Sequence, residues 1–358
     1  MTMSTKLYNI IDNIEPLDLE WKEKAHEYLE TLAIPHWSLG ELLNIAERLA
    51  GIQKTLKPSV TKKCVIIMAG DHGVIEEGVS AYPQEVTPQM ISNFVRKGAS
   101  INILADVVGA DVVVVDVGVA VDLDEYVEND SIISAKVAYG TKNMIKGPAM
   151  TREEAERSIL VGIEAVEKVI REKGTQLIAT GDMGIGNTTP SSAILSVMTG
   201  QKVVEVTGVG TGIDESRFIN KVRVIEKAIE INSPDSKDPI DVLSKVGGFE
   251  IGGIAGIILG AAYYKVPVVV DGLISTAGAL IAKALNHNTV DYMIAAHKSV
   301  EPGHDYMWKS LNLKPLLDLK FRLGEGTGAA MAMNIVEGAA QVMNRVLTYD
   351  DARVTKGV

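Results

Sequence analysis

A glycine-flanked carboxylate near the C-terminus is the residue most clearly placed for chemistry. Glu325 stands in the segment Arg322-Leu-Gly-Glu-Gly-Thr-Gly328, directly before a predicted helix. Core packing does not explain a carboxylate in that position. One interpretation is a carboxylate stabilised by the positive end of the helix dipole. The other is a general base held on a tight turn, with Leu323 forming an apolar wall beside it. The residues alone leave both interpretations open.

A second candidate is a loop with the groups needed to bind a phosphate. It follows a predicted strand, precedes a predicted helix and contains Gly184, Ile185, Gly186, Asn187 and Thr188. The two glycines let the backbone approach an anion, and the asparagine and threonine add side-chain donors. The helix that follows would point its positive N-terminus at the ligand. The spacing therefore favours an anion site.

Three known nucleotide-binding patterns are missing from the chain. The dipeptide Gly-Lys of a Walker A loop occurs nowhere. Gly208-Val-Gly-Thr-Gly212 begins like a dinucleotide fingerprint, but Ile213 stands where the last glycine is needed. Val112 to Asp116 is followed by Val117, so the chain lacks the adjacent carboxylates with which enzymes using phosphoribosyl pyrophosphate hold the ribose. P-loop ATPases and dehydrogenases are thereby excluded, and a phosphoribosyl group would arrive on a different donor.

Histidine and aspartate side chains allow a metal-dependent hydrolase as an alternative. Asp71 and His72 follow one predicted strand, and His297 and His304 follow another. None of the 6 histidines belongs to an HExxH motif. The single cysteine, Cys64, excludes an intramolecular disulfide and a cysteine-rich zinc site. Histidines with ordinary partners in loops are the simpler interpretation, so we expect no metal site.

Short apolar runs that alternate with helical windows must position these loops. The strand candidates are Cys64–Ala69, Val112–Val117, Leu177–Thr180, Val266–Asp271 and Met293–Ala296. Helical windows span 88–108, 151–172, 188–198, 214–231, 252–264, 276–285 and 327–347. This alternation is typical of an α/β fold with a mostly parallel sheet and helices on both faces. Because the carboxyl ends of parallel strands meet at one edge, we expect the polar loops to converge there.

Composition and charge are those of an ordinary globular protein. Of 358 residues, 46% are hydrophobic and 23% are charged, and the net charge is −11. The acidic balance argues against nucleic acid as a partner, since phosphate backbones bind basic surfaces. Residues 1–20 lack an apolar signal segment, and the longest apolar stretch, 252–264, is shorter than the ~20 residues that span a bilayer. We expect that stretch to be a buried helix, and the protein to be cytoplasmic with no membrane partner.

Predicted helices at both ends of the chain suggest a second, smaller domain. The first sixty residues have helical patterns, and the last predicted helix starts at about Thr327. Since chain termini often lie together, we expect residues 1–60 and about 327–358 to form a discontinuous small helical domain. Residues 61–326 would form the α/β catalytic domain.

Seven motifs follow one another along the chain: Ala69-Gly-Asp-His-Gly73, Glu77-Gly-Val-Ser80, Thr180-Gly-Asp-Met-Gly-Ile-Gly-Asn-Thr-Thr189, Gly208-Val-Gly-Thr-Gly212, Asp271-Gly-Leu-Ile-Ser275, His297 to His304 and Leu323-Gly-Glu-Gly-Thr-Gly328. With these motifs in this order, the chain resembles the nicotinate-nucleotide–dimethylbenzimidazole phosphoribosyltransferases. The resemblance implies a Rossmann-like, mostly parallel sheet domain, a small helical domain and a homodimer. It also implies transfer of 5-phosphoribosyl from nicotinate mononucleotide to 5,6-dimethylbenzimidazole, which yields α-ribazole 5′-phosphate and nicotinate for the nucleotide loop of cobalamin (vitamin B12).

The resemblance further implies roles for single residues. Glu325 would be the catalytic base, and Asp182 a secondary catalytic group. The mononucleotide phosphate and ribose would be held by Gly184, Ile185, Gly186, Asn187, Thr188, Lys221 and Ser299. The base pocket would be lined by Leu323 and the segment from Ser80 to Gln84. No cofactor and no metal is implied.

One position departs from the family pattern. The family commonly has glutamate where this chain has Asp182, whose carboxylate reaches one methylene less far. Two alternatives therefore stay open: a catalytically silent or partner-dependent homologue, and a transferase that prefers another lower-ligand base, such as adenine or a phenol. The intact Glu325 and glycine loop disfavour the silent homologue. Base selectivity depends on about 1–3 kcal/mol per methyl group, and no motif resolves it.

Overall fold

The protein is built on one parallel sheet, seen in a computed structural model that describes residues 3–355. The 6-stranded sheet has the order β3-β2-β1-β4-β5-β6, and every neighbouring pair is parallel. The strands are β1 (Lys63–Gly70), β2 (Ala110–Gly118), β3 (Ile133–Ser134), β4 (Leu177–Met183), β5 (Val268–Val270) and β6 (Met293–Ala295). The predicted fold class and the predicted strands are confirmed. The edge strand β3 was not predicted, because 2 residues carry no periodic signal.

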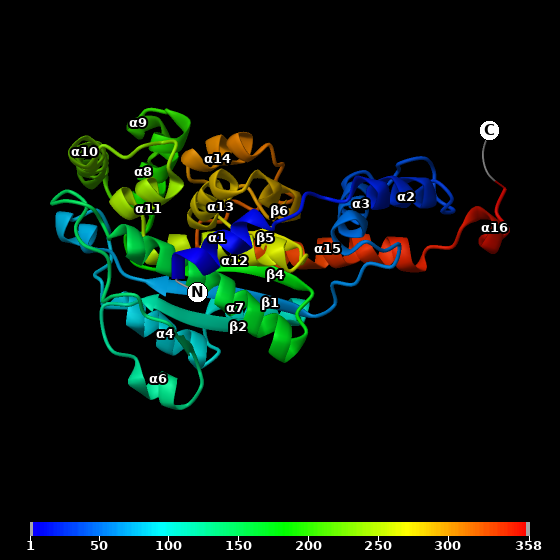
Figure 1. Cartoon of the computed structure of the whole chain (residues 1–358), viewed down its shortest axis with the longest axis horizontal. Helices are drawn as coiled ribbons and strands as arrows, with labels where there is room; N and C mark the ends of the chain where they lie inside the picture. Colours follow the sequence, from blue (N-terminus) through cyan, green and yellow to red (C-terminus); the bar gives the residue numbers. More distant parts are fainter. Residues whose placement is uncertain (1–2, 356–358) are drawn as a thin grey trace.

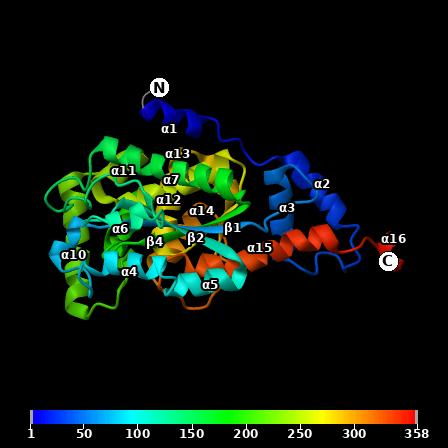
Figure 2. The ribbon, with the colours of Figure 1, turned by 90° about the horizontal axis from the view of Figure 1, so that it is seen from below.

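Helices cover both faces of the sheet. In β1, Cys64, Ile66 and Met68 face the core formed with α7 (Arg152–Lys173), α12 (Phe249–Tyr263) and α13 (Leu273–Leu285). The alternate side chains, Val65, Ile67 and Ala69, face the core formed with α4 (Val86–Val95), α5 (Ser100–Val108) and α15 (Thr327–Arg345). Figure 2 shows these two groups of helices above and below the strands. Burial on both faces is why the strands appear in the sequence as continuous apolar runs.

The remaining helices connect these layers or extend them. They are α1 (Met3–Asp12), α2 (Leu19–Leu29), α3 (Glu41–Gln53), η1 (Gly73–Glu77), α6 (Asp124–Glu128), α8 (Thr188–Thr199), α9 (Val203–Val206), α10 (Glu215–Asn232), α11 (Pro239–Val246), η2 (His287–Tyr292), α14 (Gly303–Leu311) and α16 (Tyr349–Ala352). The predicted helical window 88–108 is divided into α4 and α5. Lys97 adopts a left-handed conformation with φ of 59°, which cannot continue a helix.

The two ends of the chain meet in a helical extension beside the sheet. Figure 1 shows α2 and α3 lying over the C-terminal part of α15, with α16 beyond them. The Ala33 N–H donates to the Leu347 carbonyl at 2.9 Å, and Leu32 bridges Thr348. By contrast, α1 lies on α7, where Lys6 forms an ion pair with Glu164 at 3.0 Å. The division at residues 60 and about 327 stays a prediction, and α1 belongs by contact with the α/β part.

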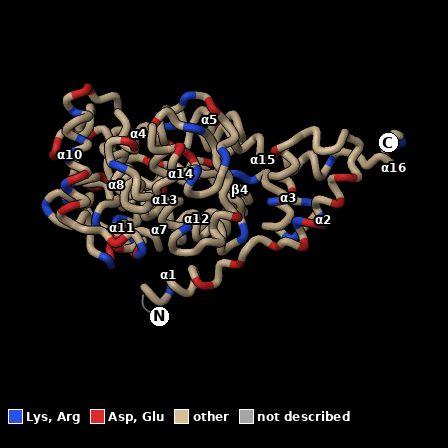
Figure 3. The backbone as a smooth tube through the Cα atoms, turned by 90° about the horizontal axis from the view of Figure 1, so that it is seen from above, with Lys and Arg blue, Asp and Glu red and all other residues tan. Residues whose placement is uncertain are grey.

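Charged residues of both signs are mixed along the outer helices. Figure 3 shows lysines and arginines interspersed with aspartates and glutamates, as in α2 and α10. Such mixing is typical of solvated helix faces. None of the helices within residues 3–355 combines the length and the apolar character needed to cross a membrane.

Close contact between α7 and α12 gives a prediction about stability. The predicted buried helix 252–264 is confirmed as α12. A Cβ atom at Gly162 would lie 1.9 Å from the Gly253 carbonyl oxygen, so the two helix backbones touch there. We expect Gly162→Ala to lower the free energy of unfolding by about 1–3 kcal/mol, measured by urea denaturation. Gly338→Ala, where no described atom lies within 4 Å, is the control and is expected to be neutral or stabilising. Equal destabilisation by both changes would contradict this explanation.

Candidate active site

The polar loops converge at the point where the strand order reverses. Strands β2 and β3 lie on one side of β1 in the sheet, and the later strands β4, β5 and β6 lie on its other side. In sheets of this kind, ligands bind outside the carboxyl ends of the strands at that point. The loops after β1 and β4 touch there, since a Cβ atom at Gly184 would lie 2.1 Å from the Gly70 carbonyl oxygen. The predicted convergence is confirmed.

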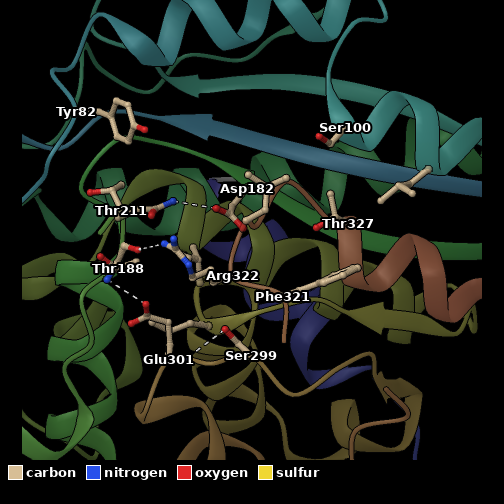
Figure 4. Close-up of a pocket in the computed structure, with 16 residues that line it drawn as sticks. Tyr82, Ser100, Asp182, Thr188, Thr211, Ser299, Glu301, Phe321, Arg322 and Thr327 are labelled. Atoms are coloured by element: carbon tan, nitrogen blue, oxygen red, sulfur yellow. Dashed lines mark hydrogen bonds between the residues drawn. The ribbon is translucent and has the colours of Figure 1, made fainter. Parts of the chain in front are cut away.

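Two adjoining cavities occupy this edge, with volumes of about 610 and 470 Å³. Both are lined by Tyr82, Ser100, Asp182, Asn187, Thr188, Thr211 and Leu323. The larger cavity alone reaches Gly210, Ser299, Glu301, Phe321 and Arg322. The smaller cavity alone reaches Val79, Ser80, Val86, Met90, Met183, Gly184, Ile185, Gly186 and Glu325. Figure 4 shows the larger cavity, with Ser299 and Glu301 on its lower wall. The arrangement fits two ligands that meet at a shared wall.

Glu325 lies on a strained turn at the smaller cavity. Gly324, Glu325 and Gly326 have φ angles of 82°, 62° and 89°, a run of left-handed residues that explains both glycines. The Gly326 and Ala329 N–H groups donate to the Asp271 carboxylate at 3.2 and 2.8 Å, and this anchors the turn to the end of β5. Glu325 Oε2 has no hydrogen-bond partner among the described residues. A turn of this kind fixes one carboxylate oxygen for an incoming donor.

The surroundings of Glu325 tune its basicity. Only 6% of the residue is exposed. Burial raises the pKa of Glu325 to about 7, and the negative charge of Asp271 adds to this effect. A carboxylate stabilised by a helix dipole would have a lowered pKa. The general-base interpretation therefore fits the structure better than the dipole interpretation.

Asp182 lies on the wall that the two cavities share. Its Oδ2 accepts a hydrogen bond from Asn187 Nδ2 at 3.0 Å, and its Oδ1 has no partner among the described residues. Burial raises the pKa of Asp182 well above its usual range, and the neighbouring Asp271, Glu250 and Glu325 add to this effect. A Cβ atom at Gly324 would lie 3.1 Å from Asp182 Oδ2, so this carboxyl group borders the Glu325 turn. It holds a proton more readily than an ordinary aspartate does.

Lys221 is a buried cation behind the cavity wall: it is not among the described residues that line either cavity, but it contacts Thr188, which lines both. It reaches from α10 to donate to Thr188 Oγ1 at 2.7 Å and to the Gly208 carbonyl at 3.3 Å. Burial lowers the pKa of Lys221 to about 8, although the Glu301 carboxylate partly offsets this. Thr188 begins α8, whose positive N-terminus faces the same cavity wall. The Lys221 ammonium group, the Thr188 hydroxyl and the N-terminus of α8 together form a site suited to a phosphate.

The residues of the predicted phosphate loop do not all line the same cavity, and not every residue of the predicted base-pocket segment lines a cavity. Asn187 and Thr188 face both cavities, whereas Gly184, Ile185 and Gly186 line only the smaller one. Ser80 lines the smaller cavity, and Leu323, which is 56% exposed, faces both. Gln84 is not among the described residues that line either cavity. Ser299 lines the larger cavity.

The sequence reasoning assigned no role to Glu301 or Arg322. Arg322 Nη1 donates to the Gly210 carbonyl at 3.2 Å and lines the larger cavity. Glu301 Oε1 accepts a hydrogen bond from the Gly210 N–H at 3.0 Å. Both residues stand in motifs noted above, but their meeting at Gly210 depends on the tertiary fold. Tyr82 belongs to the predicted base-pocket segment from Ser80 to Gln84, and it lines both cavities.

The four residues of the alternative metal site have separate partners, and Asp71 Oδ2 accepts a hydrogen bond from the Ala120 N–H at 2.9 Å. His72 Nε2 lies 2.9 Å from Glu250 Oε1, and His297 Nε2 lies 3.5 Å from Asp271 Oδ1. His304 accepts from the Ser299 N–H at 2.9 Å and contacts Thr276 Oγ1 at 2.9 Å. Burial lowers the pKa of His304 to about 3, which keeps the ring neutral. Within residues 3–355, no group of three or more histidine, cysteine or acidic side chains is arranged to hold a metal ion.

Comparison with known proteins gives consistent matches over nearly the whole chain. A family model described as phosphoribosyltransferase matches residues 14–354. Nicotinate-nucleotide–dimethylbenzimidazole phosphoribosyltransferase of Syntrophotalea carbinolica is 51% identical over 351 residues, which cover 98% of this chain and 99% of that protein. The enzyme of the same name from Desulfotalea psychrophila is 52% identical over 343 residues, or 96% of each chain. The crystal structure of that enzyme from Thermus thermophilus superimposes with a TM-score of 0.89 at 41% identity, covering 95% of this chain and 100% of the other.

Proposed function

This chain belongs to the nicotinate-nucleotide–dimethylbenzimidazole phosphoribosyltransferase family, and on that premise we propose that it transfers 5-phosphoribosyl from nicotinate mononucleotide to 5,6-dimethylbenzimidazole. The products are α-ribazole 5′-phosphate and nicotinate, and the former serves the nucleotide loop of cobalamin. One observation carries the proposal: two cavities adjoin, with the raised-pKa carboxyl group of Glu325 in the smaller one and the Lys221–Thr188 pair beside the larger one.

The two cavities suit the two substrates. Nicotinate mononucleotide would occupy the larger cavity, with its phosphate near Thr188, Lys221 and Ser299. Charge-assisted hydrogen bonds from an ammonium group to phosphate are among the stronger polar contacts in proteins. The planar base would occupy the smaller cavity, where Met90, Met183 and other apolar side chains form the walls. Both ligands then approach each other beside Asp182.

The proposed mechanism needs one proton acceptor at the acceptor base. Nicotinate linked through its ring nitrogen is a pyridinium, so it departs as a neutral ring that bears its own carboxylate. One benzimidazole nitrogen attacks C1′ from the opposite face, which gives the α configuration, while the other nitrogen loses its proton. Glu325 accepts that proton, because a base with a pKa near 7 is well matched to proton transfer at neutral pH. Asp182 assists as a secondary group at the shared wall.

Assembly and location are part of the same proposal. The family resemblance supports a homodimer of this chain, and the composition supports a cytoplasmic location. Light scattering on the purified chain, with an expected mass of twice 38.4 kDa, tests the dimer. A mass of one chain at micromolar concentration would contradict it.

The activity is tested by incubating the purified chain with nicotinate mononucleotide and dimethylbenzimidazole and identifying the products by chromatography and mass spectrometry. We expect equal amounts of α-ribazole 5′-phosphate and nicotinate. Product formed only with adenine, a phenol or another benzimidazole would replace the acceptor in this proposal. If no base of such a panel gave product, the silent or partner-dependent homologue would be the better interpretation.

A further inference from the structure

Glu301 presents an unused carboxylate oxygen at the wall of the larger cavity. Only 6% of the residue is exposed. Its Oε1 accepts the Gly210 N–H at 3.0 Å, whereas its Oε2 is buried and has no hydrogen-bond partner among the described residues. Figure 4 shows Glu301 beside Ser299 and below Thr188. Because a buried acceptor without a partner is unfavourable, a ligand that supplies a hydrogen-bond donor would be favoured there.

The surrounding chain is built to keep this carboxylate in place. A Cβ atom at Gly208 would lie 1.8 Å from Glu301 Oε2, so any larger residue at 208 would displace the carboxylate. The backbone N–H of Glu301 donates to Ser299 Oγ at 3.3 Å, which fixes the start of the turn. The glycine-rich segment from 208 to 212, which is no dinucleotide fingerprint, thus shapes the wall around Glu301.

The carboxylate that the sequence pattern associates with ribose binding is engaged elsewhere. Asp116, at the end of β2, accepts hydrogen bonds from the Gly118 and Val119 N–H groups at 3.1 and 2.9 Å. Its other oxygen forms an ion pair with Lys136 at 2.9 Å. With these partners Asp116 stabilises the end of β2, and it is not among the described residues that line either cavity. The carboxylates among the described residues that line the larger cavity are Asp182 and Glu301, and Asp182 lies on the wall shared with the smaller cavity.

The hydrogen-bonding groups of the donor nucleotide indicate which of them would bind Glu301. The inference rests on the proposed function, in which nicotinate mononucleotide occupies the larger cavity. Its phosphate is an acceptor of hydrogen bonds, as is its nicotinate carboxylate, and both repel a carboxylate. Its two ribose hydroxyls are the groups that donate. We infer that Glu301 Oε2 accepts a hydrogen bond from a ribose hydroxyl of the phosphoribosyl donor, and so selects ribonucleotides over deoxyribonucleotides.

The test compares three donors on three forms of the protein. The donors are nicotinate mononucleotide and its 2′-deoxy and 3′-deoxy analogues, and the proteins are the wild type, Glu301→Gln and Glu205→Gln. Glu205 is exposed on α9, so its change removes the same charge outside the cavities. In the wild type, one deoxy donor should lower kcat/KM by about 10-fold or more. In Glu301→Gln that preference should shrink to within about 3-fold, while Glu205→Gln should behave as the wild type does.

The other possible outcomes would contradict either this inference or the proposed function. If Glu301→Gln lowered activity with all three donors by the same factor, Glu301 would only support Gly210 and Lys221, and the inference would be wrong. A wild type that used both deoxy donors as well as the ribonucleotide would also overturn it. If the wild type transferred nothing, the proposed function would fail. Calorimetric binding of the same donors would then still decide whether Glu301 distinguishes ribose from deoxyribose. Thermal unfolding of Glu301→Gln, expected near the wild-type midpoint, excludes misfolding.

Discussion

Replacing Glu325 by glutamine is expected to lower kcat for phosphoribosyl transfer by about 10²- to 10⁴-fold, the usual contribution of a general base. Glutamine keeps the size of the side chain and can occupy the same turn, but it cannot accept the benzimidazole proton. Binding of nicotinate mononucleotide should change little, because the larger cavity is untouched. Initial rates under saturating donor and acceptor measure the effect. Glu205→Gln is the matched control, and a Glu325→Gln variant within about 3-fold of wild type would exclude Glu325 as the base.

The pH dependence of kcat/KM should carry the signature of two buried groups. Glu325, with a pKa of about 7, must be ionised to accept a proton, so activity should fall as the pH drops below 7. Lys221, with a pKa of about 8, must be charged to attract the phosphate, so activity should fall as the pH rises above 8. The wild type should therefore give a narrow bell-shaped profile. The Glu325→Gln variant should lose the acidic limb and keep the basic one. An acidic limb that persisted in the variant would have to come from another group.

The sequence was informative wherever burial or backbone geometry restricts the choice of residue. Strands buried on both faces need continuous apolar runs, and this requirement made β1, β2 and β4 recognisable. The glycines beside Glu325 were recognisable because three successive left-handed residues favour glycine. The convergence of the loops followed from the parallel sheet alone. Fold class and the central carboxylate could thus be predicted from local rules.

Features that depend on distant contacts could not be predicted in this way. The division of the 184–188 loop between two cavities depends on tertiary packing, in which α4 and the start of α5 form part of the wall of the smaller cavity. Glu301 is held at the cavity wall by a hydrogen bond from the Gly210 N–H, which lies 91 positions away in the sequence. α1 docks by burying Leu7, Ile10 and Ile11 in the core, and its sequence pattern does not show that α7 is the helix it packs on. Neither periodicity nor motif spacing contains such pairings.

Lys221→Met is expected to lower kcat/KM for nicotinate mononucleotide by about 100-fold, because a charged hydrogen-bond donor to the phosphate is lost. Methionine has a similar length and an apolar tip, so it fills the space that the lysine stem occupies. The loss should appear mainly as a higher KM for the donor. With nicotinate riboside, which has no phosphate, wild type and variant should differ by less than about 3-fold. Lys227→Met, on the exposed side of the same helix, is the control.

The thermal stability of Lys221→Met shows whether its loss of activity comes from lost phosphate binding or from damage to the fold. The pKa of Lys221 is lowered from its ordinary value of 10.5 to about 8, so the folded protein binds this proton less tightly than the unfolded chain does. The charge therefore opposes folding at pH 7, and the opposition declines as the pH rises from about 8 to 10.5. Lys221→Met removes this penalty but also the hydrogen bonds to Thr188 and the Gly208 carbonyl, so the two effects oppose each other and the variant should unfold near the wild-type temperature. A variant that loses donor affinity while its thermal stability is kept would assign Lys221 to the phosphate. Equal losses with both donors would show instead that Lys221 mainly holds Thr188 and Gly208 in place.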